Sequence, residues 1–246
     1  MNNELCIGIL GGVGPQATQY VYEKICAFAQ SKYGVSENDA FPRILILSEP
    51  VTDFISSKER FPEARKQVLS AVERLIQANV THLAIASNTV HLLSDDIEAL
   101  CKNHSVVFVS MISAVADHCA RKGYKIVGIL GSPVTLRSQL YDNALSAKEI
   151  DLKKPNESDY SELGCIIKRV IAGKVTPADA TFFKKMYSEC ARSSDAVLLG
   201  CTELPVLHTQ LQIGTYAIDS SSILAKALLK HYYSTEKSQN TKEHTS

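Results

Sequence analysis

The chain has 246 residues, of which 45% are hydrophobic and 21% are charged, a composition typical of a globular protein with an apolar core. Basic and acidic residues each total 26, so the net charge is zero and no basic excess favours nucleic acid or an acidic membrane as a partner. The first residues lack the pattern of a signal peptide, and no apolar run reaches membrane-spanning length. We therefore expect a cytoplasmic protein.

The seven cysteines are scattered along the chain, odd in number, and without a C-x-x-C pair. This pattern predicts free thiols in a reducing compartment. Histidine, cysteine and acidic residues show no spacing typical of a metal site, so we expect no metal.

Apolar runs of strand length alternate with amphipathic segments in the first half of the chain. The first run, residues 5–10, ends in a glycine-rich turn, and Pro15 suits the first turn of the helix that follows. Alternating strands and helices predict a parallel sheet. The further strands are expected at 43–47, 82–86 and 106–109, and the further helices at 62–79, 92–102 and 111–122.

The second half repeats the opening of the first. Residues 125–131 resemble residues 6–11 in sequence, and Gly8 and Gly128 are 120 residues apart, close to the 114 that separate Ser87 from Cys201. Two features with nearly one offset predict an internal duplication into two α/β domains with mainly parallel sheets. The further strands are expected at 149–152, 196–200 and 214–219, and the further helices at 133–147, 157–172, 177–193 and 220–232.

The duplication leads to a domain assignment. We expect an N-terminal domain of residues 1–112 plus 214–233, because the last helix would return to pack on the first half, with Asp219 as its cap. Residues 113–213 would form the C-terminal domain. Residues 234–246 have no apolar periodicity and are predicted to be a disordered tail.

A small nucleophilic side chain follows an apolar run in each half, Ser87 in the first and Cys201 in the second. Ligands bind at the carboxyl ends of strands in open α/β sheets, so we interpret the two residues as two sides of one site. A thiolate at Cys201 would be stabilised by the following helix start and by Thr202. Two readings stay open for His91, a structural histidine or an orienting residue, and for Glu203, a helix cap or a site residue.

The glycine-rich turn after the first strand does not have the spacing of the dinucleotide fingerprint. The residue Pro15 stands where that fingerprint needs an approach to pyrophosphate, so we expect no nicotinamide cofactor. A turn that binds a small group through backbone N–H groups, including Gly12 and Val13, fits better.

Four segments together resemble the aspartate/glutamate racemase family: residues 7–17, 87–91, 200–205 and 218–220. The resemblance covers residues 4–232. It implies two pseudo-symmetric α/β domains with the active site at their interface, a small-molecule amino-acid substrate, no cofactor, and a homodimer. In this family, two acid/base groups on opposite sides of Cα remove the α-proton and return one.

The resemblance also implies roles for individual residues. Cys201 and Ser87 would be catalytic, and His91 a possible orienting residue. The family motif has cysteine where this chain has Ser87, which excludes a symmetric two-thiol mechanism and matches members that pair a hydroxyl with the second cysteine. The residues implied in substrate binding are Gly12, Val13, Asn88, Thr89, Thr202 and Glu203.

The expected substrate is L-aspartate and/or L-glutamate. Members that act on aspartate carry an arginine after the second strand and a lysine before an Ala-Gly pair, where this chain has Ile171. Arg60, Lys168 or Arg169 would have to compensate. Two alternatives remain, a single-cysteine decarboxylase of the arylmalonate type and a catalytically silent carboxylate-binding protein, and α-proton exchange separates an enzyme from a binding protein.

Overall fold

The computed structural model describes residues 4–52, 58–214 and 217–243, which form two α/β halves. In the first half the elements are β1 (Ile7–Gly11), α1 (Pro15–Tyr33), β2 (Ile44–Ser48), α2 (Phe61–Gln77), β3 (His82–Ile85), α3 (Ser94–Asn103), β4 (Val107–Val109) and α4 (Met111–Lys122). The second half follows with β5 (Ile126–Gly131), α5 (Pro133–Arg137), α6 (Leu140–Ser146), β6 (Asp151–Lys153), α7 (Tyr160–Ile171), α8 (Pro177–Ala191), β7 (Ala196–Gly200), α9 (Leu204–Gln210) and β8 (Ala217–Asp219). The last helix is α10 (Ser220–Glu243). Single 3-10 turns cover Asn38–Ala40, Lys58–Arg60, Thr89–Leu93 and Glu157–Asp159.

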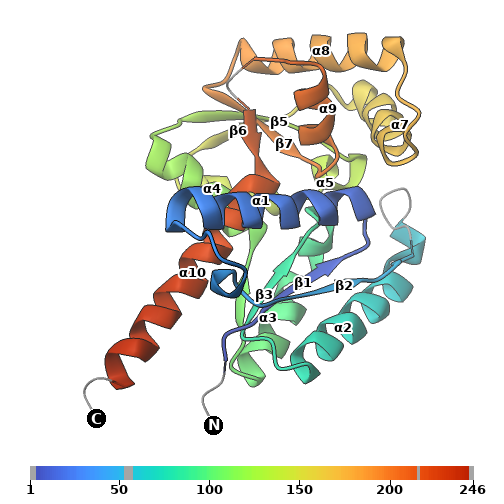
Figure 1. The fold of residues 1–246 in the computed structure, drawn as a ribbon. Helices are drawn as coiled ribbons and strands as arrows, with labels where there is room; N and C mark the ends of the chain where they lie inside the picture. Colours follow the sequence, from blue (N-terminus) through green and yellow to red (C-terminus); the bar gives the residue numbers. More distant parts are fainter. Residues whose placement is uncertain (1–3, 53–57, 215–216, 244–246) are drawn as a thin grey trace.

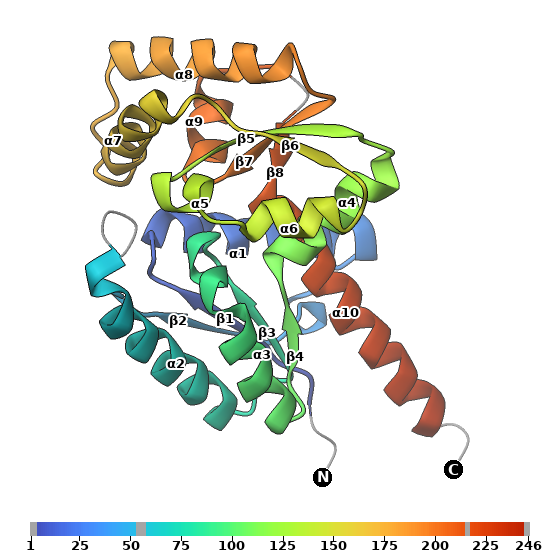
Figure 2. The ribbon, with the colours of Figure 1, turned by 180° about the vertical axis from the view of Figure 1, so that it is seen from behind.

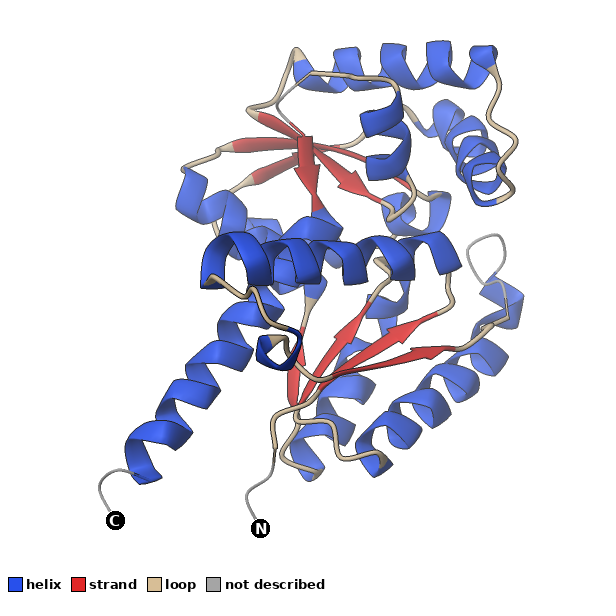
Figure 3. Ribbon diagram, in the orientation of Figure 1, coloured by secondary structure: helices blue, strands red, loops and turns tan. Residues whose placement is uncertain are grey.

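Each half contains a parallel four-stranded sheet. The strand orders are β2-β1-β3-β4 and β6-β5-β7-β8, so the first strand of each half pairs with the second and third in the same way. The halves are stacked in space (Figures 1 and 2), and the first sheet's arrows point toward the second half (Figure 3). The predicted fold class, two similar α/β halves with parallel sheets, is confirmed.

The central strands are buried because helices cover both faces of the sheets, which is why they are apolar without alternation. In the first half, α2 and α3 pack on one face, and α1 and α10 pack on the other. The second half has its own core, to which α4 contributes from the linking region. Across the described residues, none of the helices has the length and apolar character that a membrane span requires.

The chain's last strand differs from the predicted domain assignment. The strand β8 pairs with β7, so residues 217–219 belong to the second sheet and not to the first half, to which we had assigned residues 214–233. The helix α10 does return to the first half, where Leu224 and Leu228 are fully buried beside α1. The cap is as expected, since Asp219 Oδ1 accepts hydrogen bonds from the amides of Ser221 and Ser222.

Two further predictions of local structure are corrected. The predicted helix at 133–147 is two helices, because Ser138 is extended (φ −75°, ψ 166°) between α5 and α6. The predicted disordered tail is helical as far as Glu243, and residues 244–246 lie outside the described residues. The N-terminal part of α10 packs on the first half of the protein, and the helix continues from there past Tyr233. In this continuation, the Thr235 hydroxyl contacts His82 Nε2 at 3.3 Å.

Candidate active site

Ser87 lies two residues after β3 and is almost fully buried, with 5% of its surface exposed. Its carbonyl oxygen accepts a hydrogen bond from Nδ1 of His91 at 2.7 Å, while the amide of Met111 donates to His91 Nε2 at 3.0 Å. Both ring nitrogens are therefore occupied, and burial lowers the pKa of His91 to about 4. His91 is a neutral residue that positions the Ser87 loop, with no nitrogen left to relay a proton.

Asn88 connects the first half to the second. Its Oδ1 accepts a hydrogen bond from the Tyr141 hydroxyl at 2.5 Å, and its Nδ2 donates to Ser220 Oγ at 3.2 Å. Ser220 in turn donates to the carbonyl of Leu199 in β7 at 3.1 Å. Since these side chains are buried, the contacts fix the orientation of the Asn88 amide against the strand that leads to Cys201.

Thr89 forms a second connection between the halves. Its hydroxyl lies 3.4 Å from Ser132 Oγ and 3.2 Å from Thr135 Oγ1, at the start of α5. All three residues are buried. The Thr89 hydroxyl therefore already has hydrogen-bond partners in the second half, and would have to share itself between these and a ligand.

Cys201, Thr202 and Glu203 follow β7 as a buried polar cluster. The Cys201 thiol donates to Glu203 Oε2 at 3.0 Å, and the Thr202 hydroxyl donates to the same oxygen at 3.1 Å. Burial raises the pKa of Cys201 well above its usual value, and the adjacent Glu203 raises it further, although the backbone amides of Thr202 and Glu203 lower it. The expected stabilised thiolate is therefore not the form favoured here; the thiol holds its proton.

The glycine-rich turn of the first half packs against Glu203. A Cβ at Gly14, whose φ is +90°, would overlap Oε1 of Glu203, so only glycine allows this approach. The Gly12 amide, predicted to bind substrate, instead donates to Thr18 Oγ1 at 3.0 Å. Val13 is half-buried in the same turn, beside the approach of Gly14 to Glu203.

Each half contributes a tyrosine whose hydroxyl donates a hydrogen bond to a side chain of the other half, a feature that we did not predict. Tyr20 of α1 donates to Asp219 Oδ2 of the second sheet at 2.8 Å, and Tyr141 of α6 donates to Asn88 of the first half. The pKa of Tyr141 is raised, first by burial and then by Cys119 and Cys201. The signal available in the sequence was the internal repeat itself, since a tyrosine occurs in the first helical region of each half.

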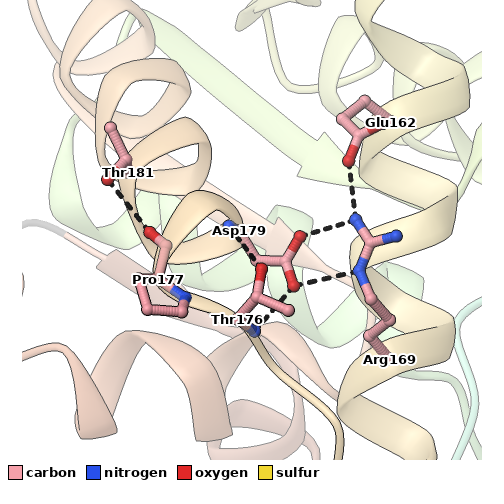
Figure 4. A network of polar contacts seen from close by, with 6 residues as sticks. All are labelled: Glu162, Arg169, Thr176, Pro177, Asp179 and Thr181. Carbon is pink, nitrogen blue, oxygen red and sulfur yellow. Dashed lines mark hydrogen bonds and ion pairs between the residues drawn. The ribbon is translucent and has the colours of Figure 1, made fainter.

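Among the described residues, none of the basic side chains proposed for a side-chain carboxylate bonds to the site, and their surroundings differ. Arg169 is held by Asp179, through bonds of 2.9 Å from Nε and 2.5 Å from its terminal nitrogen, and by Glu162 at 2.6 Å (Figure 4). Arg60 and Lys168 are exposed. Ile171 accepts a hydrogen bond at its carbonyl from Gln16 Nε2 at 2.9 Å, and so lies at the contact between the halves.

Within residues 4–52, 58–214 and 217–243, the hydrogen bonds and ion pairs join no lysine or arginine to Ser87, Cys201 or Glu203. In the same ranges, histidine, cysteine and acidic residues form no group of three that could hold a metal ion. The site is thus built from a thiol, hydroxyls, an amide and one buried carboxylate.

The chain resembles known proteins in sequence and in fold. The family model described as Asp/Glu/Hydantoin racemase matches residues 10–228. The broad specificity amino-acid racemase RacX of Bacillus subtilis is 25% identical over 228 residues, covering 92% of this chain and 97% of RacX. An aspartate racemase homologue from Pyrococcus horikoshii superposes with a TM-score of 0.73 at 28% identity, over 92% of this chain and 98% of that one. The aspartate racemase of Picrophilus torridus gives 0.76 at 23% identity, over 93% and 94%, and shows the shared fold.

The burial of His91 predicts a pH dependence of stability. An unfolded histidine has a pKa of about 6.5, so between that value and the folded pKa of about 4 the unfolded state binds more protons. The contribution of His91 to the free energy of unfolding is therefore complete above pH 6.5. It is lost as the pH falls toward 4, and amounts to up to about 3 kcal/mol. Urea unfolding at several pH values should show a steeper loss for the wild type than for His91→Asn; parallel curves would contradict the assignment.

The Tyr141 hydroxyl should stabilise the contact between the halves. Tyr141→Phe leaves Asn88 Oδ1 buried without its donor, which should lower the free energy of unfolding by about 1–3 kcal/mol. The matched control is Tyr22→Phe, because Tyr22 is 43% exposed and should change stability little. Equal urea midpoints for the two variants would show that the Tyr141 bond carries no such energy.

Proposed function

Because the chain belongs to the Asp/Glu/hydantoin racemase family, we propose that it racemises a small amino acid by exchanging the Cα proton with Cys201 on one face and Ser87 on the other. The observation that carries this proposal is the Cys201–Glu203 pair at the end of β7, packed against the glycine turn of the other half. Ser87 lies two residues past the equivalent strand of the first sheet, and its neighbour Asn88 bonds to Tyr141 of the second half.

Inversion at Cα requires a proton to leave one face and another to arrive on the opposite face. One group takes the α-proton, and the electron pair of the broken C–H bond delocalises into the carboxylate. The conjugate acid of the other group then delivers its proton to the opposite face, which forms the new C–H bond. In the direction in which Cys201 donates, its thiol already carries the proton, and Ser87 must be ionised to act as the base. In the reverse direction the thiol must first pass its proton to Glu203, whose Oε2 lies 3.0 Å away.

Glu203 suits the α-ammonium group of the substrate. It is a buried side chain whose Oε2 accepts hydrogen bonds from the Cys201 thiol at 3.0 Å and from the Thr202 hydroxyl at 3.1 Å. A bound ammonium would offset the negative charge of Glu203 and favour the Cys201 thiolate. The Asn88 amide and the Val13 backbone N–H are the donors best suited to the carboxylate, where negative charge develops.

The first substrates to consider are L-aspartate and L-glutamate. A wider range that includes uncharged side chains is the second candidate, because Arg169 is already held by two carboxylates and Ile171 lies at the contact between the halves. The similarity to RacX, whose name states a broad specificity, supports the same candidate.

Incubation of the protein with single L-amino acids, followed by chiral chromatography, tests the proposal. We expect the D-enantiomer to form from at least one acidic or uncharged amino acid. Cys201→Ser and Ser87→Ala should each lower turnover by at least about 100-fold, the size of an acid/base contribution. The control Cys165→Ser changes an exposed cysteine and should retain activity.

The outcomes distinguish the alternatives. Retained activity in Cys201→Ser would overturn the assignment of the acid/base pair. Loss of carbon dioxide from a substituted malonate without racemisation would indicate a decarboxylase. Binding of amino acids without α-proton exchange would indicate a silent binding protein.

A further inference from the structure

A groove of about 500 Å³ lies between α4 and α10, outside the site described above. Its apolar residues include Phe108 and Val109 of β4 and Ile223 of α10. The strand β4 forms the edge of the first sheet, and α10 runs beside it (Figure 2). We call this feature the α4–α10 groove; its volume is in the range that holds a small organic molecule.

Four basic side chains from three helices line the α4–α10 groove. They are Lys32 of α1, Arg121 of α4, and Lys226 and Lys230 of α10, the last two one helical turn apart. In the part of the chain that the structure describes, none of the ion pairs involves any of the four. Lys226 lies 4.5 Å above the ring of Phe28, which fixes its position but leaves its charge intact.

The acidic residues of the groove do not balance this charge. The groove contains Glu98 and Asp117, and Asp117 is already paired with Lys148 at 2.7 Å. The pKa of His118, which also lines the groove, is lowered first by burial and then by the positive charges of Arg121, Lys122 and Lys226. A local cationic excess on a protein of zero net charge attracts anions.

We propose that the α4–α10 groove binds an organic anion that carries at least two phosphate groups. The basic residues come from three different helices that line the groove, so more than one anionic group can be paired there at once. The apolar residues provide a surface for the organic part of the ligand. The hydroxyls of Ser110 and Ser113 line the groove as further polar groups.

Isothermal titration calorimetry of the full chain with ADP, pyrophosphate and inorganic phosphate, at low ionic strength, tests this proposal. We expect saturable binding in the order ADP, pyrophosphate, phosphate. The double variant Lys226→Ala, Lys230→Ala should weaken ADP binding by at least about tenfold, through the loss of two charge-assisted contacts. The matched control is Lys184→Ala, Lys185→Ala, which removes two lysines from α8 in the other half.

Several results would overturn the proposal. These are the absence of saturable binding, equal weakening in the groove and control variants, or phosphate binding as tightly as pyrophosphate. Equal affinity for ADP and pyrophosphate would overturn the role given to the apolar residues. ADP binding should persist in Cys201→Ser, and its loss there would place the ligand in the proposed active site.

Discussion

The side-chain amide of Asn88 is bonded to the second half of the chain on both of its polar atoms. This amide accepts from Tyr141 and donates to Ser220, which is itself bonded to the strand before Cys201. In a buried setting, each of these groups would be costly to leave without a partner. The requirement to satisfy them holds the Ser87 loop in one orientation relative to β7, and a two-sided proton transfer needs such an orientation.

The same burial determines the protonation of the site. Cys201 and Glu203 are both buried and lie within hydrogen-bond distance, so a second negative charge on the thiol is unfavourable. A ligand with a positive group would change this balance, which couples substrate binding to the acidity of the thiol. His91 contributes differently, since its neutral ring only holds the Ser87 loop and the start of α4.

The sequence was sufficient to predict the two parallel sheets because buried strands appear as unbroken apolar runs, and the repeat indicated two similar halves. It did not predict that β8 joins the second sheet or that α10 continues past Tyr233, since both depend on packing between distant segments. The motifs located Ser87 and Cys201 at equivalent strand ends. The Tyr141 contact and the protonated thiol were missed because they arise from burial and from partners distant in sequence.

The central claim is that two groups on opposite faces of Cα share the proton transfer. Incubation of one enantiomer in deuterated water, stopped early and analysed by NMR after chiral separation, measures this directly. The account predicts deuterium at Cα in the inverted product and protium in the recovered substrate, because each face uses its own monoprotic group. Deuterium appearing equally fast in the recovered substrate would mean that one group serves both faces, and would contradict the account.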